Sequence, residues 1–307
     1  MHPVLLSIGS LSISSFGFFL TLGFLLAAFV VWRLAKTYDL HEEKVLDLAI
    51  LSFFGGILGG RIYFVVFNWP IFGSLEKALL LNRYPGLAFW GAVLGGALAL
   101  WFFAKRLKLP FWQIGDFAAV GFLIGVSLGN IGCFLGGCNF GYSSNLPFAV
   151  SQVGVIGKRL PLSLMEAVIF ALAAYRLFQG AVRFHFGGKI LSSALILLGI
   201  VKFITQFWRD ENAPQSFGLA GTLVISGIAV YYIRSKRSFL QDLKMAGGII
   251  TSGKRRQITL ATARKSWYNF MIGWKVRLSK LYKFLSKAPR LLRKLNVKPT
   301  PRDIIED

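Results

Sequence analysis

Charged residues are scarce in this sequence, and cysteine and histidine are scarcer still. Asp, Glu, Lys and Arg make up 16% of the 307 residues, whereas a soluble globular domain carries about 25%. The two cysteines, Cys133 and Cys138, are too few for a disulfide-stapled scaffold. The three histidines, His2, His41 and His185, lie far from both cysteines in the sequence, so no zinc-ligand pattern is present. We therefore do not expect a soluble globular domain, and we predict no metal site and no cofactor.

Two further patterns are missing. The N-terminus lacks the positive segment of a signal peptide, and its apolar run is too long for one. We find no series of segments that alternate with period two, as the strands of an outer-membrane barrel do. The composition is instead 55% hydrophobic, and apolar runs of about 20 residues recur, each long enough to span the hydrocarbon core. These runs predict an all-α polytopic protein of the cell (inner or plasma) membrane.

Seven of these runs are predicted to cross the bilayer. Basic residues follow the odd-numbered runs, so by the positive-inside rule the N-terminus lies outside and the C-terminus is cytoplasmic. Lys158 and Arg159, on a predicted outer loop, are the main exception. The predicted spans are 16–32, 45–67, 86–104, 111–135, 162–178, 190–208 and 217–233.

Basic charge is concentrated at the C-terminal end. Residues 234–307 contain 19 Lys and Arg against 4 Asp and Glu. The basic residues are interleaved with apolar ones at helical spacing and no nucleic-acid-binding motif accompanies them, so we expect contact with an anionic membrane surface and no nucleic acid. A solvated, partly disordered tail is the alternative. We predict two domains, a transmembrane domain at 1–235 and a basic amphipathic cytoplasmic tail at 236–307.

Polar residues at membrane depth are the candidates for function. An ionisable residue inside a span costs about 2.5–3.5 kcal/mol on insertion scales, so it usually faces the interior of the bundle. Two or three cations in one cavity suit an anion, most simply a phosphate, and internal ion pairs or span-end anchors are the alternative. Lys202 and Arg209 are seven residues apart, which predicts one shared helix face. The candidates are Arg61, Asp116, Glu166, Lys202 and Arg209, with Asn130 and Gln206 as uncharged additions.

The glycine-rich stretch 121–141, GFLIGVSLGNIGCFLGGCNFG, surrounds Asn130 and both cysteines. Its glycines would let neighbouring helices approach closely. Cys133 and Cys138 are more often small core residues than nucleophiles. They could form a disulfide, although their spacing does not guarantee the geometry.

Five stretches together resemble segments of the prolipoprotein diacylglyceryl transferase family, over about residues 5–235. GNIGCFLGGCNFG (129–141) is similar to the family signature, typically G-R-x-G-(N or C)-F followed by G-(E or C)-x-x-G. SLSISSFGFFLTLGFLLA (10–27) resembles the first span of the family. GGRIYFVVFN resembles G-A-R-x-x-Y-V-x-F and retains Arg61. LPLSLMEA resembles P-x-Q-L-Y-E-A with Glu166 retained, and VKFITQFWRDEN resembles R-F-x-x-E-F-x-R-x-P-D with Arg209 retained.

The resemblance implies a reaction and its partners. The family transfers a diacylglyceryl group from phosphatidylglycerol to the lipobox cysteine of a preprolipoprotein, whose signal peptide is the protein partner. On this basis Arg61, Lys202 and Arg209 would hold the phosphate, and Glu166, or less favourably Asp116, would act as base. The substrate-binding residues would be Arg61, Asn130, Trp90, Phe16, Cys133, Gly141 and Gln206.

Five positions depart from the family pattern. Asn130 stands for the signature arginine, Trp90 for a catalytic histidine, Lys202 for an arginine, Gln206 for a glutamate and Phe16 for a tyrosine. The first hypothesis is an active, divergent transferase. The second is an inactive relative that binds phospholipid or lipoprotein without turnover. A small-solute transporter is disfavoured, because we find no inverted repeat and no paired broken helices.

Overall fold

The computed structural model describes residues 4–8, 11–74, 86–152, 154–183, 185–210, 214–239 and 241–242, with six more residues scattered farther along the chain. The chain divides into two compact units, Met1–Lys236 and Arg237–Asp307. Almost all of the described residues belong to the first unit. The amphipathic tail predicted from the sequence lies mostly outside the described residues.

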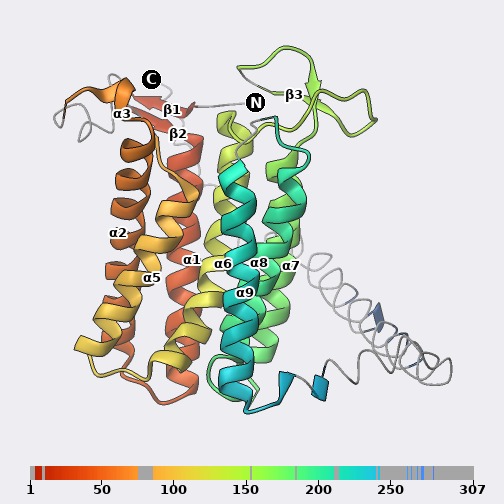
Figure 1. The fold of residues 1–307 in the computed structure, drawn as a ribbon. Helices are drawn as coiled ribbons and strands as arrows, with labels where there is room; N and C mark the ends of the chain where they lie inside the picture. Colours follow the sequence, from red (N-terminus) through yellow and green to blue (C-terminus); the bar gives the residue numbers. More distant parts are fainter. Residues whose placement is uncertain are drawn as a thin grey trace, which may run out of the picture. The chain divides into compact units, whose positions relative to one another are not determined.

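Helices dominate the described part of the chain (Figure 1). Six of them are long and apolar enough to cross a membrane, so the protein is a polytopic membrane protein. The sixth predicted span was expected to reach residue 208, whereas its helix ends at Gln206. The helices are α1 (Ser15–Thr37), α2 (Glu42–Phe67), the short α3 (Trp69–Phe72), α5 (Phe89–Arg106), α6 (Phe111–Gly136), α7 (Leu162–Ala181), α8 (Lys189–Gln206) and α9 (Pro214–Ser235).

Helix α2 shows how these sequences face lipid. Phe54, Leu58, Ile62 and Val66 recur every four residues, and each is more than half exposed. Residues four apart share a helix face, so they form one apolar stripe. Such a stripe would be an aggregation hazard in water, whereas in a bilayer it contacts acyl chains.

The opposite face of α2 packs closely on α5. A Cβ atom built on Gly59 would lie 2.5 Å from the carbonyl oxygen of Gly91 and 2.7 Å from the Cα of Gly95. A Cβ on Gly95 would meet the oxygen of Gly55 at 2.4 Å. Glycine every four residues therefore brings the two backbones into contact, as small residues do between membrane helices.

We expect Gly59→Ala to destabilise the protein by about 1–3 kcal/mol, because the added methyl group overpacks the α2–α5 contact. The matched control is Gly221→Ala in α9, where an added Cβ meets nothing within 4 Å. Thermal unfolding in detergent compares the two variants. Equal melting temperatures for both would contradict the packing described here.

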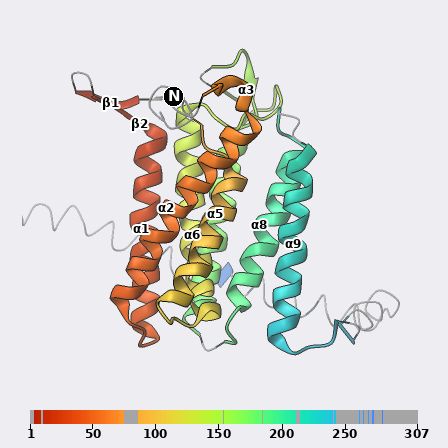
Figure 2. The same cartoon turned by 60° about the vertical axis from the view of Figure 1, so that its left-hand side comes forward.

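Helix α6 lies at the centre of the bundle, against α1, α7 and α8 (Figures 1 and 2). Its glycines allow close approach, as the sequence predicts. A Cβ on Gly132 would lie 3.0 Å from the Cα of Phe16, and one on Gly121 would lie 2.8 Å from a methyl group of Val31. The residues 121–141 thus form the second half of the central helix and the loop that follows it.

Two small hairpins accompany the helices. Strand β1 (Val4–Ile8) pairs antiparallel with β2 (Leu11–Ser14), and β3 (Val150–Ser151) pairs with β4 (Lys158–Arg159). The sequence LSIS in β2 alternates apolar and polar residues, a short period-two signal that the prediction missed. Both hairpins lie at the end of the bundle where α1 and α7 begin (Figure 1).

Candidate functional site

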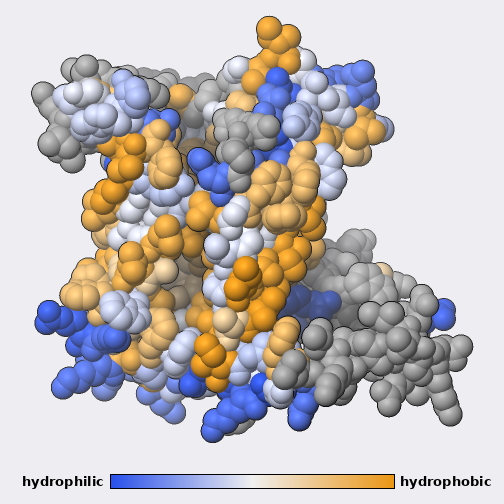
Figure 3. Space-filling view, in the orientation of Figure 1, coloured by the Kyte–Doolittle hydropathy of each residue, from blue (hydrophilic) through white to orange (hydrophobic). Residues whose placement is uncertain are grey.

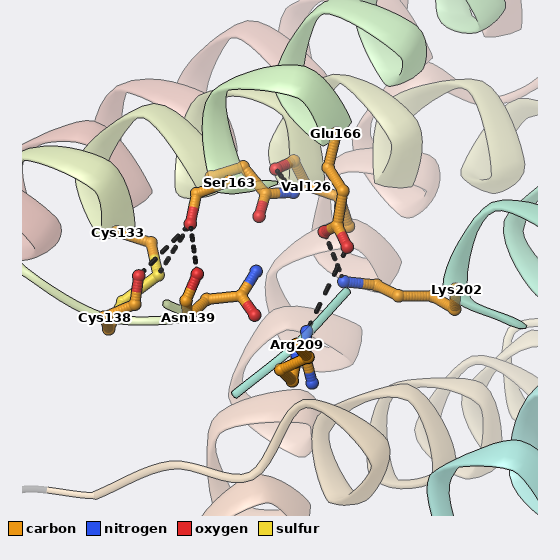
Figure 4. The surroundings of a disulfide bond; sticks show 9 residues. Val126, Cys133, Cys138, Asn139, Ser163, Glu166, Lys202 and Arg209 are labelled. Atoms are coloured by element: carbon orange, nitrogen blue, oxygen red, sulfur yellow. Dashed lines mark hydrogen bonds and ion pairs between the residues drawn. A yellow bond between two sulfur atoms is a disulfide. The ribbon is translucent and has the colours of Figure 1, made fainter. Parts of the chain in front are cut away.

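Glu166 is the centre of a buried polar cluster. Glu166 lies in the second turn of α7 and is fully buried. The Nζ of Lys202 lies 2.6 Å from its Oε2, and the Oγ1 of Thr205 donates a hydrogen bond to its Oε1 at 2.7 Å (Figure 4). Lys202 and Thr205 are on the last turns of α8. The start of α7 and the end of α8 therefore meet at one end of the bundle.

Arg209 completes the cluster from outside the helix. The prediction that it shares a helix face with Lys202 is wrong, because α8 ends at Gln206. Beyond the end of α8, the backbone pairs with a loop that is distant in the sequence. The N–H of Tyr142 donates to the carbonyl of Trp208, and the N–H of Asp210 donates to the carbonyl of Phe140. The guanidinium still reaches Glu166, with Nη2 at 4.0 Å from Oε1. Two cations therefore meet one carboxylate.

Aromatic rings surround the ammonium group of Lys202. Its Nζ lies 4.4 Å from the ring centroid of Phe89 and 5.9 Å from that of Phe170. Only 8% of Lys202 is exposed. Charges in such an apolar setting interact strongly because water screens them poorly. The cluster carries one positive charge more than its carboxylate neutralises, so it is suited to an anion.

The disulfide that the sequence analysis left open is formed between Cys133 and Cys138. It joins the last turn of α6 to the loop after it. Ser163, on α7, donates a hydrogen bond to the carbonyl of Cys138 at 3.2 Å and lies 3.7 Å from the Sγ of Cys133. Because Ser163 is three residues before Glu166 on the same helix, the disulfide loop borders the charged cluster (Figure 4).

Asn139 is a site residue that the sequence analysis missed. Its side chain points toward Lys202 and Arg209 (Figure 4). Its Oδ1 is buried and has no hydrogen-bond partner among the described residues, and the same holds for the Nε of Arg209. The backbone of Asn139 has φ 61°, a left-handed conformation that asparagine tolerates better than most residues. The sequence offered one indication of this residue, its position directly after Cys138 in the stretch that resembles the family signature.

Three predicted residues lie close to this cluster. Cys133 is in the disulfide. Gly141 pairs with Arg209 through a backbone bridge, and a Cβ on Gly141 would lie 2.7 Å from the oxygen of Leu160. Gln206 is the buried last residue of α8, and its carbonyl accepts a hydrogen bond from the N–H of Arg209.

Arg61 contacts the segment just before α5, and Trp90 lies at the start of α5. The Nη1 of Arg61 donates to the carbonyl of Gly86 at 3.0 Å, and its guanidinium lies 5.1 Å from the ring centroid of Phe72. The indole N–H of Trp90 donates to the Oγ of Ser216 on α9 at 3.3 Å. Phe89, between Gly86 and Trp90, links this segment to Lys202 through the ring contact described above.

Asn130 and Phe16 lie on α6 and α1. The Nδ2 of Asn130 donates to the carbonyl of Val126 one turn earlier in its own helix, at 3.0 Å, and the residue is 8% exposed. Phe16 packs by its backbone against Gly132. Phe16 therefore contributes to the packing of α1 on α6.

Asp116 belongs to a different cluster. Its carboxylate accepts hydrogen bonds from the N–H groups of Gly188 and Leu191 and lies 3.1 Å from the Nε2 of His185. It thus caps the N-terminus of α8, where a negative charge is favourable. Lys202 is eleven residues beyond Leu191 on this helix, or about 16 Å at 1.5 Å per residue. Asp116 is therefore too far away to act as a base at Glu166–Lys202.

Tyr38, directly after α1, completes this second cluster. Its hydroxyl donates to the carbonyl of Ala181 at 2.7 Å. Burial, and then the nearby charge of Asp116, raise the pKa of Tyr38 above its ordinary value. Its role is to join the ends of α1 and α7.

Known proteins are similar to this chain over its membrane part. A family profile described as prolipoprotein diacylglyceryl transferase matches residues 3–235. A protein of Finegoldia magna named phosphatidylglycerol–prolipoprotein diacylglyceryl transferase is 30% identical over 250 residues, covering 79% of this chain and 99% of its own. One of the same name from Trichormus variabilis is 33% identical over 273 residues, covering 86% of this chain and 89% of its own. This chain belongs to the prolipoprotein diacylglyceryl transferase family, a family of transferase enzymes of lipoprotein biosynthesis.

Proposed function

We propose that this protein transfers the diacylglyceryl group of phosphatidylglycerol to the lipobox cysteine of preprolipoproteins. The observation that carries the proposal is the Glu166–Lys202–Arg209 cluster, in which two cations, one of them buried, meet one buried carboxylate. An anionic phosphodiester supplies the charge that this cluster lacks. The names of the relatives contain phosphatidylglycerol and prolipoprotein, which supports these two substrates in the proposal.

The reaction exchanges one bond for another. The thiolate of the acceptor cysteine attacks the glycerol carbon of the diacylglyceryl group. A carbon–sulfur bond forms, the bond from that carbon to the phosphate oxygen breaks, and glycerol phosphate leaves. The phosphate gains negative charge as it leaves, so cations placed beside it stabilise the transition state more than the ground state. The thiol proton goes to a base and then to the released phosphate or to water.

The geometry suggests how four residues divide this work. Lys202 and Arg209 contact the phosphate oxygens, and Asn139 donates to them through its amide. When Lys202 turns toward the phosphate, Oε2 of Glu166 loses its partner at 2.6 Å, while Thr205 still holds Oε1 at 2.7 Å. A carboxylate that has lost a cationic neighbour is more basic. Glu166 is then ready to accept the thiol proton.

We also propose that α5 crosses the membrane in addition to the six helices named above, which gives seven spans. The N-terminus is then outside and the C-terminus is cytoplasmic. Basic residues follow or end α1, α5, α7 and α9 at Lys36, Lys105, Arg183 and Arg234. Figure 3 shows hydrophilic residues at that end of the bundle below an apolar band. The Glu166 cluster is at the opposite end, so the site faces the outer leaflet. Residues 236–307 then form a cytoplasmic tail that contacts anionic lipid.

Expression in cells depleted of their own transferase tests the function. We expect a lipoprotein reporter to gain the mass of one diacylglyceryl group. The same reporter with its lipobox cysteine changed to serine is the control and stays unmodified. An unmodified reporter, with this protein present in the membrane, contradicts transferase activity. Binding of phosphatidylglycerol to that inactive protein would then favour the non-catalytic hypothesis.

A further inference from the structure

One side-chain hydrogen bond joins the start of α5 to the start of α9. The indole Nε1 of Trp90 donates to the Oγ of Ser216 at 3.3 Å. Trp90 is the second residue of α5, and Ser216 is the third residue of α9. Ser216 is buried, so its hydroxyl is not simply a solvated surface group.

These two helices belong to different sides of the bundle. Helix α5 packs along α2, and α9 packs along α8. The two ribbons run apart from the Trp90–Ser216 end toward the other end (Figures 1 and 2). The space-filling view is hollowed between them (Figure 3). The hydrogen bond therefore spans a place where the two helices are not held by continuous packing.

The residue next to Trp90 covers the charged cluster. The ring of Phe89 lies 4.4 Å from the Nζ of Lys202. A cation on the face of an aromatic ring is stabilised there, and an incoming phosphate cannot occupy the same place. A motion that carries the start of α5 away from α9 also moves Phe89 away from Lys202, because Phe89 and Trp90 are adjacent on α5.

We propose that the Trp90–Ser216 hydrogen bond is a latch across the lipid entrance of the site. A diacyl phospholipid enters from the bilayer between α5 and α9, breaks this bond and displaces Phe89 from Lys202. The inference rests on the proposed function for the identity of the lipid. Trp90 is thus a positioning residue that sets how readily the lipid reaches the cations.

Removing the Trp90–Ser216 hydrogen bond is expected to increase the apparent affinity for the lipid. The lipid binds only the open form, so its apparent affinity is reduced by the fraction of protein that is open. A hydrogen bond of ordinary net strength, about 0.5–1.5 kcal/mol, lowers that fraction by about 2- to 10-fold when the closed form dominates. Trp90→Phe keeps a ring and removes the N–H. Ser216→Ala removes the acceptor.

The experiment measures the purified protein in nanodiscs of phosphatidylcholine with increasing phosphatidylglycerol. Binding is followed with spin-labelled phosphatidylglycerol in the absence of the peptide, and transfer is followed after a lipobox peptide is added. We expect both variants to lower the half-saturating phosphatidylglycerol fraction by about 2- to 10-fold. The double variant should go no lower than either single one. The controls are Trp101→Phe in α5 and Ser226→Ala in α9, whose side chains contact Lys105 and the carbonyl of Leu223.

Three outcomes would overturn the latch. An effect of Trp90→Phe without one of Ser216→Ala means that the indole contacts substrate directly. Weaker binding in both variants means that the bond builds the site. Unchanged binding in both means that the bond does not restrict entry. Because binding is read without peptide, a wild-type protein that binds lipid but transfers nothing refutes the proposed reaction and leaves the latch measurable.

Discussion

Replacing Lys202 with alanine is expected to abolish diacylglyceryl transfer, with a fall of at least about 100- to 1,000-fold in rate. Lys202 is the buried cation with the shortest contact to Glu166, at 2.6 Å. Its loss removes the positive charge beside the leaving phosphate. It also leaves the fully buried carboxylate of Glu166 with a single cation, Arg209, at 4.0 Å. Transfer to a lipobox peptide is the measurement, normalised to folded protein.

The variant alone does not separate catalysis from folding, because breaking a buried ion pair destabilises a protein by about 3–5 kcal/mol. The double variant Lys202→Ala, Glu166→Gln does separate them, since it removes the buried carboxylate together with its closest cation. We expect it to recover thermal stability and to remain inactive. Recovery of activity in the double variant would mean that Lys202 only neutralises Glu166. Lys202→Arg keeps the charge and should retain a substantial part of the activity.

The long apolar helices and two members of the Glu166 cluster could be predicted from the sequence for physical reasons. Apolar length limits where a helix can cross, so each predicted span overlaps a long helix, and six of these helices are apolar enough to cross a membrane. An ionisable residue inside a span is rarely without a partner, which made Glu166 and Lys202 separate candidates. Their pairing required the fold, because it depends on the meeting of α7 and α8.

Arg209 and Asn139 show what sequence periodicity could not supply. Helical spacing placed Arg209 on α8, but the backbone bridge with Gly141 takes it out of the helix. That partner is far away in the sequence, so no local rule finds it. Asn139 carries no charge and follows the end of α6, so a search for ionisable residues inside the spans could not find it.

Loss of the Cys133–Cys138 disulfide is expected to reduce transfer by about 10-fold or more. The disulfide closes a loop of about six residues, which stabilises the folded conformation of that loop by about 2 kcal/mol. The segment directly after this loop begins with Asn139, which faces the cations, and continues to Gly141, whose backbone pairs with Arg209. The disulfide therefore positions one cation and one amide of the site, although neither sulfur contacts substrate.

The Cys133→Ser, Cys138→Ser double variant and the wild-type protein treated with a membrane-impermeant reductant should show the same reduced rate. The reductant should have no effect on the double variant, which is the matched control for damage elsewhere. Because Ser163 still holds the carbonyl of Cys138 at 3.2 Å, the loop loosens without detaching, and the helical bundle keeps its melting temperature to within a few degrees. Wild-type protein with both thiols titratable and an unchanged rate would show that the Asn139–Gly141 loop holds Arg209 without the disulfide.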